Sequence, residues 1–130
     1  MIRRSLMALV ISAILGACAR ESGPVCAVDN AGLTLPEGFC AQVVADSIGG
    51  ARHIAIAPNG DLFVALRDSN GGVMALRDAD GDGVAEQREK FGPRGGTGIA
   101  FYDNHLYFST DTSVIRWPWT DGPLVPAGSA

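Results

Sequence analysis

The chain has 130 residues, of which 47% are hydrophobic and 17 are glycine. This length suits one domain, and the high glycine content argues against a helical bundle and favours short elements joined by tight turns. Ten basic residues against 14 acidic ones give a formal net charge of -4. The chain therefore offers no basic surface to a phosphate backbone, and we expect no nucleic-acid partner.

The first 17 residues are typical of a lipoprotein signal peptide. Arg3 and Arg4 precede an apolar run over residues 6–15, which is shorter than the roughly 20 residues of a membrane-spanning helix. Residues 15–18 read Leu-Gly-Ala-Cys and resemble the lipobox of bacterial lipoproteins. We predict cleavage after residue 17 and lipidation of Cys18. An ordinary cleaved signal with an incidental cysteine is the alternative.

This processing predicts an exported protein that a lipid anchors to a membrane, facing the periplasm. No acidic retention signal follows Cys18, because the next residue is Ala19, so we expect the outer membrane. The mature chain keeps eight basic and 14 acidic residues, a net charge of -6. In an oxidising compartment we expect a disulfide between Cys26 and Cys40. Two unpaired structural thiols are the alternative, because the sequence does not give their separation.

Residues 18–38 contain many turn formers and no apolar period, which predicts a tether. From residue 39 onward, short apolar runs alternate with turn sequences, and this pattern predicts an all-β domain of antiparallel strands. The turn at Asn59 and Gly60 is typical of a hairpin. The predicted strands of the first unit cover residues 39–45, 53–57, 62–66 and 73–76.

A second unit repeats the first over residues 98–116. Corresponding positions lie 41 to 45 residues apart: Ile54 and Ile99, Leu62 and Leu106, Val73 and Val114. This period is typical of a β-propeller blade, and propellers have roughly four to eight blades. We predict a partial propeller of about two blades over residues 39–119, then a loop or truncated tail over 120–130, and therefore an amino-terminal fragment. A plain β-meander with similar hairpins is the alternative.

Four segments together carry a family resemblance: residues 35–39 (LPEGF), 52–64 (RHIAIAPNGDLFV), 76–83 (LRDADGDG) and 95–108 (GGTGIAFYDNHLYF). In their order and spacing they resemble the opening of the bacterial glucose/sorbosone dehydrogenase family. The resemblance implies a six-bladed β-propeller in which pyrroloquinoline quinone (PQQ) and calcium serve the oxidation of a sugar or sugar aldehyde in the periplasm.

The resemblance also implies a general-base histidine with an arginine shortly after it, and places both in a later blade. No such segment occurs in these 130 residues. His53 and His105 each begin an expected strand, where a histidine bonded to solvent or backbone is the better interpretation than a proton acceptor in a central channel. We therefore assign no catalytic and no quinone-binding residue, and we expect this fragment alone to be inactive.

The acidic segment over residues 78–89 has the spacing of a calcium loop. It reads Asp-x-Asp-x-Asp-Gly with a glutamate at its twelfth position, so that oxygen ligands wrap around one hard cation. The candidate ligands are Asp78, Asp80, Asp82, Glu86 and Glu89. Strands flank the segment, so it would be a calcium loop between strands and not a helix-loop-helix site. Because a loop this rich in carboxylates satisfies the ion by itself, we expect calcium to stabilise a blade and not to hold the quinone. A solvated acidic hairpin that uses Asp-Gly twice for its turns is the alternative.

Two further segments have ordinary interpretations. The glycine-rich residues 92–98 precede no helix, so we interpret them as a loop between blades and not as a phosphate cradle. Trp117 and Trp119 suit blade packing better than a sugar-stacking platform.

The sequence therefore predicts the amino-terminal part of a periplasmic, quinone-dependent sugar or aldehyde dehydrogenase. A small calcium-binding lipoprotein that acts as a binding module is the alternative function. The product of a degraded gene is a third possibility.

Overall fold

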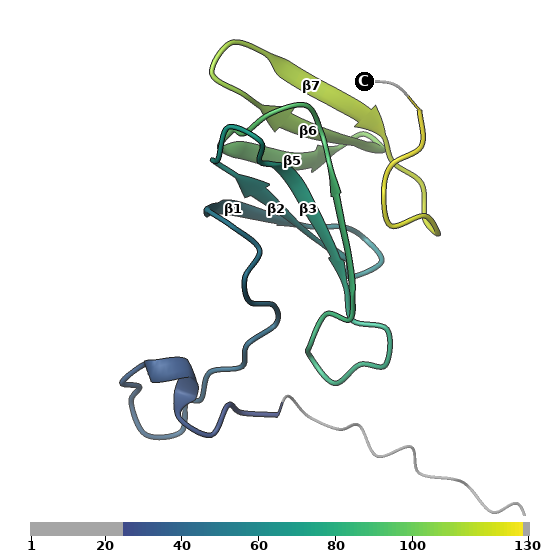
Figure 1. Ribbon diagram of the computed structural model, residues 1–130. Coiled ribbons are helices and arrows are strands. Elements are labelled where there is room, and N and C mark those ends of the chain that lie inside the picture. Colours follow the sequence, from purple (N-terminus) through teal and green to yellow (C-terminus); the bar gives the residue numbers. More distant parts are fainter. Residues whose placement is uncertain (1–24, 129–130) are drawn as a thin grey trace, which may run out of the picture.

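The computed structural model describes residues 25–128 and contains two antiparallel sheets (Figure 1). The first sheet has the order β1-β2-β3-β4 and consists of β1 (Ala51–Ile56), β2 (Leu62–Leu66), β3 (Gly72–Arg77) and β4 (Gln87–Phe91). The second sheet has the order β5-β6-β7 and consists of β5 (Gly98–Tyr102), β6 (His105–Ser109) and β7 (Val114–Pro118). The domain is all-β, as the sequence predicts. The predicted signal peptide and the lipidation site Cys18 lie outside the described residues.

Residues 25–43 form a small unit ahead of the sheets, which we call the amino-terminal lobe. A disulfide joins Cys26 to Cys40, whose Cα atoms are 5.6 Å apart. The loop that it closes contains the short 3-10 helix η1 (Asn30–Gly32). The part of the expected tether that the structure describes therefore has internal contacts of its own. No helix within residues 25–128 is long and apolar enough to cross a membrane.

The strand predicted over residues 39–45 is wrong. The carbonyl of Ala41 accepts a hydrogen bond of 2.8 Å from the backbone N–H of Ala27, and that of Val44 accepts one of 2.8 Å from Ala85. Because this segment changes its partner within three positions, it forms a ladder with neither neighbour. Its apolar composition reflects packing against the first sheet, where Val44 contacts a buried cluster.

The hairpins form where the turn residues predict them. Gly60 has a φ of 94° and donates its N–H to the Ala57 carbonyl at 2.9 Å, which closes the turn between β1 and β2. Asp103 and Asn104, between β5 and β6, have φ values of 44° and 55°. Positive φ at both central residues gives a turn whose twist matches that of the two strands it joins.

The two sheets repeat one pairing register. Each of the first three strands in one sheet has its counterpart in the other, at the spacing that the sequence repeat gives. The matching pairs are Ile54 with Val64 and Ile99 with Phe108, Leu62 with Leu76 and Leu106 with Trp117, and Val64 with Met74 and Phe108 with Ile115. The repeat therefore extends from sequence spacing to the backbone ladder itself.

The two sheets stack face to face in a head-to-tail manner, which means that the back of the first sheet covers the front of the second. We call one face of the first sheet its front, with buried Val64, Leu66 and Leu76, and the other its back, with Phe63, Ala65, Val73 and Ala75. The back packs against the equivalent front of the second sheet, which carries Leu106, Phe108 and Trp117. Alternation along each strand places these two sets on opposite faces.

Aromatic rings fill the space between the sheets. The centroid of the Phe63 ring lies 5.2 Å from that of Phe101 and 6.2 Å from that of Phe91, with the planes near perpendicular. Phe91 in turn meets Trp117 at 5.2 Å. Edge-to-face pairs of this kind add about 0.5–1.5 kcal/mol each beyond the area that they bury.

The connection between β4 and β5, over residues 92–97, carries the chain from one sheet to the other. The N–H of Gly96 donates to the Leu66 carbonyl at 2.9 Å. A side chain on Gly96 would collide with the Ser109 carbonyl oxygen, and one on Gly95 with the Asp68 carbonyl oxygen. The glycine-rich segment therefore serves as the inter-sheet loop that the sequence predicts, because only glycine permits this close approach.

Phe63→Ala should lower the free energy of unfolding by about 3–5 kcal/mol, because Phe63 is fully buried between the two sheets. Urea denaturation would measure the change. Tyr102→Ala is the control, since Tyr102 is 74% exposed, and it should shift the free energy by less than about 0.5 kcal/mol. Equal losses in the two variants would contradict the packing described above.

Candidate functional site

The loop between β3 and β4, over residues 78–86, carries several carboxylates, and we call it the acidic loop. The ligand oxygens of four acidic side chains lie within 4.8 Å of one another: Asp78, Asp80, Asp82 and Glu86. Asp78 is half-buried and the other three are exposed. Carboxylate oxygens at this spacing are the ligands that hard cations prefer. The loop can therefore bind a metal ion such as calcium.

Backbone N–H groups hold all four carboxylates in position, and Asp80 and Asp82 accept theirs from Asp82 and Val84. The two oxygens of Asp78 accept hydrogen bonds of 2.7 Å from Gly81 and from Gly83. At the far end of the loop, Glu86 Oε2 accepts one of 2.9 Å from Ala79. These contacts wrap the backbone around the carboxylates, and they stabilise the negative charge that the loop concentrates.

Glu89 is outside this group, although the loop spacing proposed it as a fifth ligand. It belongs to β4, where it pairs with Ala75 of β3. In a helix-loop-helix calcium site a glutamate at position 12 is a bidentate ligand. Here β4 begins at Gln87, and the extended backbone carries Glu89 away along the ladder.

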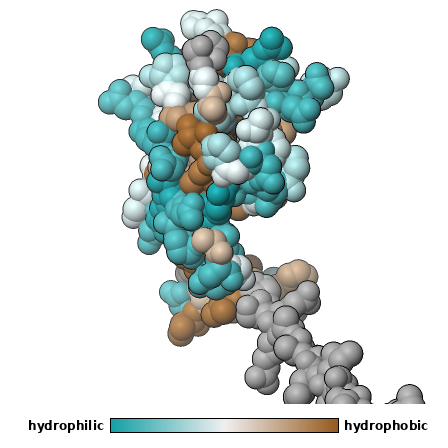
Figure 2. All heavy atoms as spheres, turned by 90° about the vertical axis from the view of Figure 1, so that its right-hand side faces the viewer, coloured by the Kyte–Doolittle hydropathy of each residue, from teal (hydrophilic) through white to brown (hydrophobic). Residues whose placement is uncertain are grey.

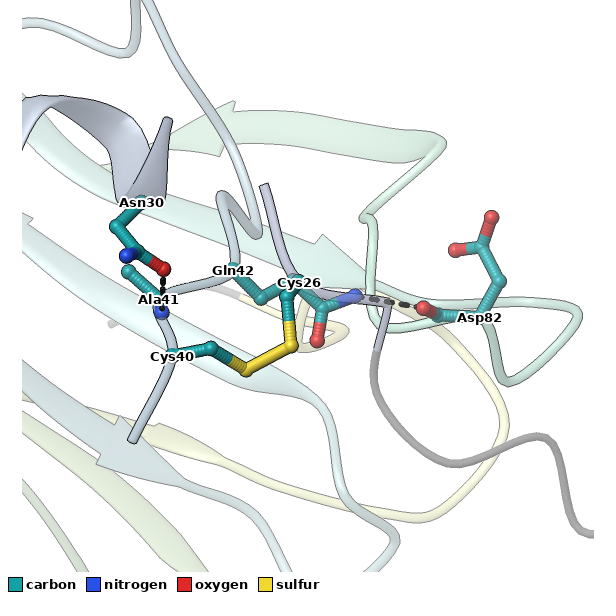
Figure 3. The surroundings of a disulfide bond; sticks show 6 residues. All are labelled: Cys26, Asn30, Cys40, Ala41, Gln42 and Asp82. Atoms are coloured by element: carbon teal, nitrogen blue, oxygen red, sulfur yellow. Dashed lines mark hydrogen bonds between the residues drawn. A yellow bond between two sulfur atoms is a disulfide. The ribbon is translucent and has the colours of Figure 1, made fainter. Parts of the chain in front are cut away.

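The amino-terminal lobe touches the acidic loop directly (Figure 3). Gln42 Nε2 donates a hydrogen bond of 2.6 Å to the carbonyl oxygen of Asp82. Next to Gln42, the N–H of Ala41 donates to Asn30 Oδ1 at 3.2 Å, close to the Cys26–Cys40 disulfide. The disulfide-closed lobe therefore braces the loop from one side.

An ion pair that the sequence reasoning missed lies at the same end of the first sheet. Arg77 Nε donates to Asp61 Oδ1 at 2.7 Å and Arg77 Nη2 to Asp61 Oδ2 at 2.6 Å. Asp61 has only 4% of its surface exposed. The two hydrogen bonds from Arg77 hold the pKa of Asp61 below its ordinary value, against the opposing effect of burial, and the pair raises the pKa of Arg77.

This pair also fastens the carboxyl-terminal segment to the first sheet. Arg77 Nη1 donates to the Gly122 carbonyl at 3.1 Å, and Asn59 Nδ2 donates to both Asp61 and Asp121 at 2.9 Å. Asp61 and Arg77 satisfy each other's charge, so their role is structural. No local sequence pattern indicated it, because the partners lie 16 positions apart and meet only when β2 and β3 pair.

Both histidines bond to backbone carbonyls. His53 Nδ1 lies 2.8 Å from the Thr97 carbonyl oxygen, and His105 Nδ1 lies 2.6 Å from that of Asp103. Because a carbonyl only accepts, each Nδ1 carries the proton. Neither imidazole contacts a carboxylate, among the described residues, that would orient it as a general base.

The two tryptophans are part of the packing between the sheets. Trp117 is 6% exposed and Trp119 is 9% exposed, and Trp119 meets Phe101 with ring centroids 5.6 Å apart. Buried rings offer no flat face to a sugar, so this arrangement favours packing between the sheets over the stacking platform.

The described residues do not fit a quinone cofactor. The buried charged side chain of Asp61 is already satisfied by Arg77. Within residues 25–128, Trp119 Nε1 is the one buried side-chain polar atom without a hydrogen-bond partner. A single indole N–H inside an aromatic core is no binding site for a polar quinone.

Comparison with known proteins adds no relative. No protein-family model, curated protein or solved structure matches the chain. The family resemblance therefore depends on the four sequence segments given above.

Calcium should raise the melting temperature of the protein. An ion that binds only the folded chain stabilises it by about 2.7 kcal/mol at a concentration one hundred times its Kd. Asp80→Asn should abolish most of this shift, because it removes one of the four converging charges. Glu89→Gln, also an acid-to-amide change, is the matched control and should keep the full shift. An equal loss in both variants would restore Glu89 as a ligand.

Stability should fall in acid through Asp61. The pKa of Asp61 is lower in the folded chain than its ordinary 3.8, so its contribution is fully present above that pH and is lost as the pH falls through the depressed value. Urea denaturation from about pH 6 to about pH 2 would measure this slope. Asp61→Asn should flatten the profile in that window, whereas Asp111→Asn, at an exposed position, should leave it unchanged.

Proposed function

We propose that the chain supplies two blades of a β-propeller, in the amino-terminal part of an exported, quinone-dependent dehydrogenase of sugars or sugar aldehydes. The head-to-tail stacking of the sheets carries this proposal. The back of one sheet covers the front of the next, and the two sheets share one register. Repetition of such a step generates a ring when the rotation closes, and a propeller is a ring of this kind.

The open face of the second sheet supports the same interpretation. Its back carries Tyr107, Ser109 and Val114, at the positions that Phe63, Ala65 and Val73 occupy in the first sheet. In the first sheet these positions are buried, whereas Val114 is 72% exposed. An apolar hollow of about 320 Å³ lies on this face. A third blade in the same relation would cover it.

The family resemblance supplies the chemistry. The resemblance implies that PQQ serves as the oxidant of the sugar. We expect its ligands and the general-base histidine in blades outside residues 25–128. In this proposal calcium in the acidic loop stabilises the first blade, and the lipid on Cys18 holds the enzyme at the outer membrane, facing the periplasm.

A second candidate function follows from the acidic loop alone. Four converging carboxylates next to a disulfide-closed lobe also suit a small calcium-binding lipoprotein that acts as a binding module. This function needs no further blades and no quinone.

The native protein, purified from its source, should distinguish the two functions. The dehydrogenase should have an intact mass several times the 13.5 kDa of this chain, and it should reduce a dye in the presence of an aldose only when quinone and calcium are both supplied. Samples that lack either addition are the controls. A native chain of residues 18–130 that binds calcium without any turnover would overturn the dehydrogenase and support the binding module.

A further inference from the structure

The amino-terminal lobe turns its apolar side chains outward. Five of the ten large hydrophobic side chains that are exposed in residues 25–128 lie in this segment of 19 residues: Val25, Val28, Leu33, Phe39 and Val43. Val28 is 107% exposed and Phe39 is 71% exposed. Single exposed apolar residues are ordinary on protein surfaces, but a concentration of them marks an interaction site.

The lobe keeps its shape without a hydrophobic core. None of its residues is buried, and its internal order comes from the Cys26–Cys40 disulfide and a few hydrogen bonds. Its apolar side chains are therefore free to meet something else. Val84 of the acidic loop adjoins them, since it lines one apolar hollow of about 330 Å³ together with Val25, Val28 and Val43.

The lobe is separate from the faces that a propeller would cover. Figure 1 shows it below the sheets, joined to β1 by an extended segment, and Figure 2 shows brown, hydrophobic atoms at this lower end of the molecule. The open back of the second sheet belongs to β5, β6 and β7. A closed ring would also cover the front of the first sheet, where Val44, Ala45 and Ile48 pack. The five exposed side chains of the lobe belong to neither of these faces.

The charge of the lobe determines which part of a membrane surface it can bind. Residues 25–43 contain Asp29 and Glu37 but no lysine, arginine or histidine. The neighbouring acidic loop adds four carboxylates. Such a surface gains nothing from anionic headgroups, so its binding depends on apolar area and resists salt.

The chain ahead of the lobe sets how far the lobe lies from a lipid anchor. Cys18 and Val25 are seven positions apart, and a fully extended chain spans at most about 3.3–3.6 Å per residue, or roughly 25 Å in all. A lipid on Cys18 therefore confines the lobe to a thin layer over the bilayer. This confinement makes its contact with the surface an intramolecular event at high effective concentration.

We propose that the amino-terminal lobe docks into the interfacial layer of the bilayer, with Val28 and Phe39 as its main apolar contacts. The inference rests on the lipid anchor of the proposed function for its geometry. The lobe then holds the sheets in a fixed orientation over the membrane, with the acidic loop beside the headgroups.

The test uses the native chain with Phe39→Trp, reconstituted in vesicles of phosphatidylethanolamine and phosphatidylglycerol that contain brominated lipid. Quenching of the introduced indole, beyond that of the parent protein's own tryptophans, is the expected result. Tyr102→Trp is the matched control, because Tyr102 is an aromatic of similar exposure, 74%, in β5 of the second sheet, and it should show no added quenching. Equal quenching at the two positions, or none at Phe39→Trp, would overturn the proposal.

The intact mass of the same sample reports the lipid on Cys18, so failure of the anchor is distinguishable from failure of the lobe. In a sample without lipid, added vesicles should still quench the Phe39→Trp indole at high vesicle concentration, and absence of this effect would overturn the proposal. In that sample Phe39→Asp should lower the partition coefficient about tenfold, and Tyr102→Asp should leave it unchanged. An indole that becomes protected only when another protein is added would also overturn the proposal.

Discussion

The ring of Phe63 lies between the two sheets, and its contacts with Phe91 and Phe101 decide how one sheet sits on the other. A sheet that is alone exposes both faces to water, and an antiparallel sheet commonly packs at least one of them against a core. In this chain the back of the first sheet finds its cover in the front of the second, and the aromatic layer between them sets the step from sheet to sheet.

The parts of the structure that depend on local chemistry could be predicted from the sequence. Alternating apolar runs and turn dipeptides predict the hairpins around Asn59 and Asn104, and the 41- to 45-residue spacing predicts the matching registers. The parts that depend on distant partners could not. Residues 39–45 look like a strand, but their backbone hydrogen bonds go to two different segments and form no ladder. Glu89 has the right spacing for a ligand, but the extended path of β4 removes it from the loop.

Carboxylates serve two different purposes at the same end of the first sheet. Asp61 is buried, and Arg77 compensates its negative charge through two hydrogen bonds, so the pair stabilises the fold. Asp80, Asp82 and Glu86 are exposed, and hydrogen bonds from the backbone, not cationic side chains, surround the loop. The charge of Asp61 is compensated because Arg77 binds both of its oxygens, whereas no arginine or lysine among residues 25–128 compensates the carboxylates of the acidic loop. The separation of these roles explains why the acidic loop, and not the ion pair, is the candidate metal site.

The disulfide between Cys26 and Cys40 also divides the molecule by the redox conditions that its parts need. Residues 44–128 contain no cysteine, so the two sheets can fold in either redox environment. The lobe has no buried residue and depends on its covalent closure, which persists only in an oxidising environment. Under reducing conditions the chain would therefore keep its sheets and lose the lobe, and with it the brace that the contact between Gln42 and Asp82 gives the acidic loop.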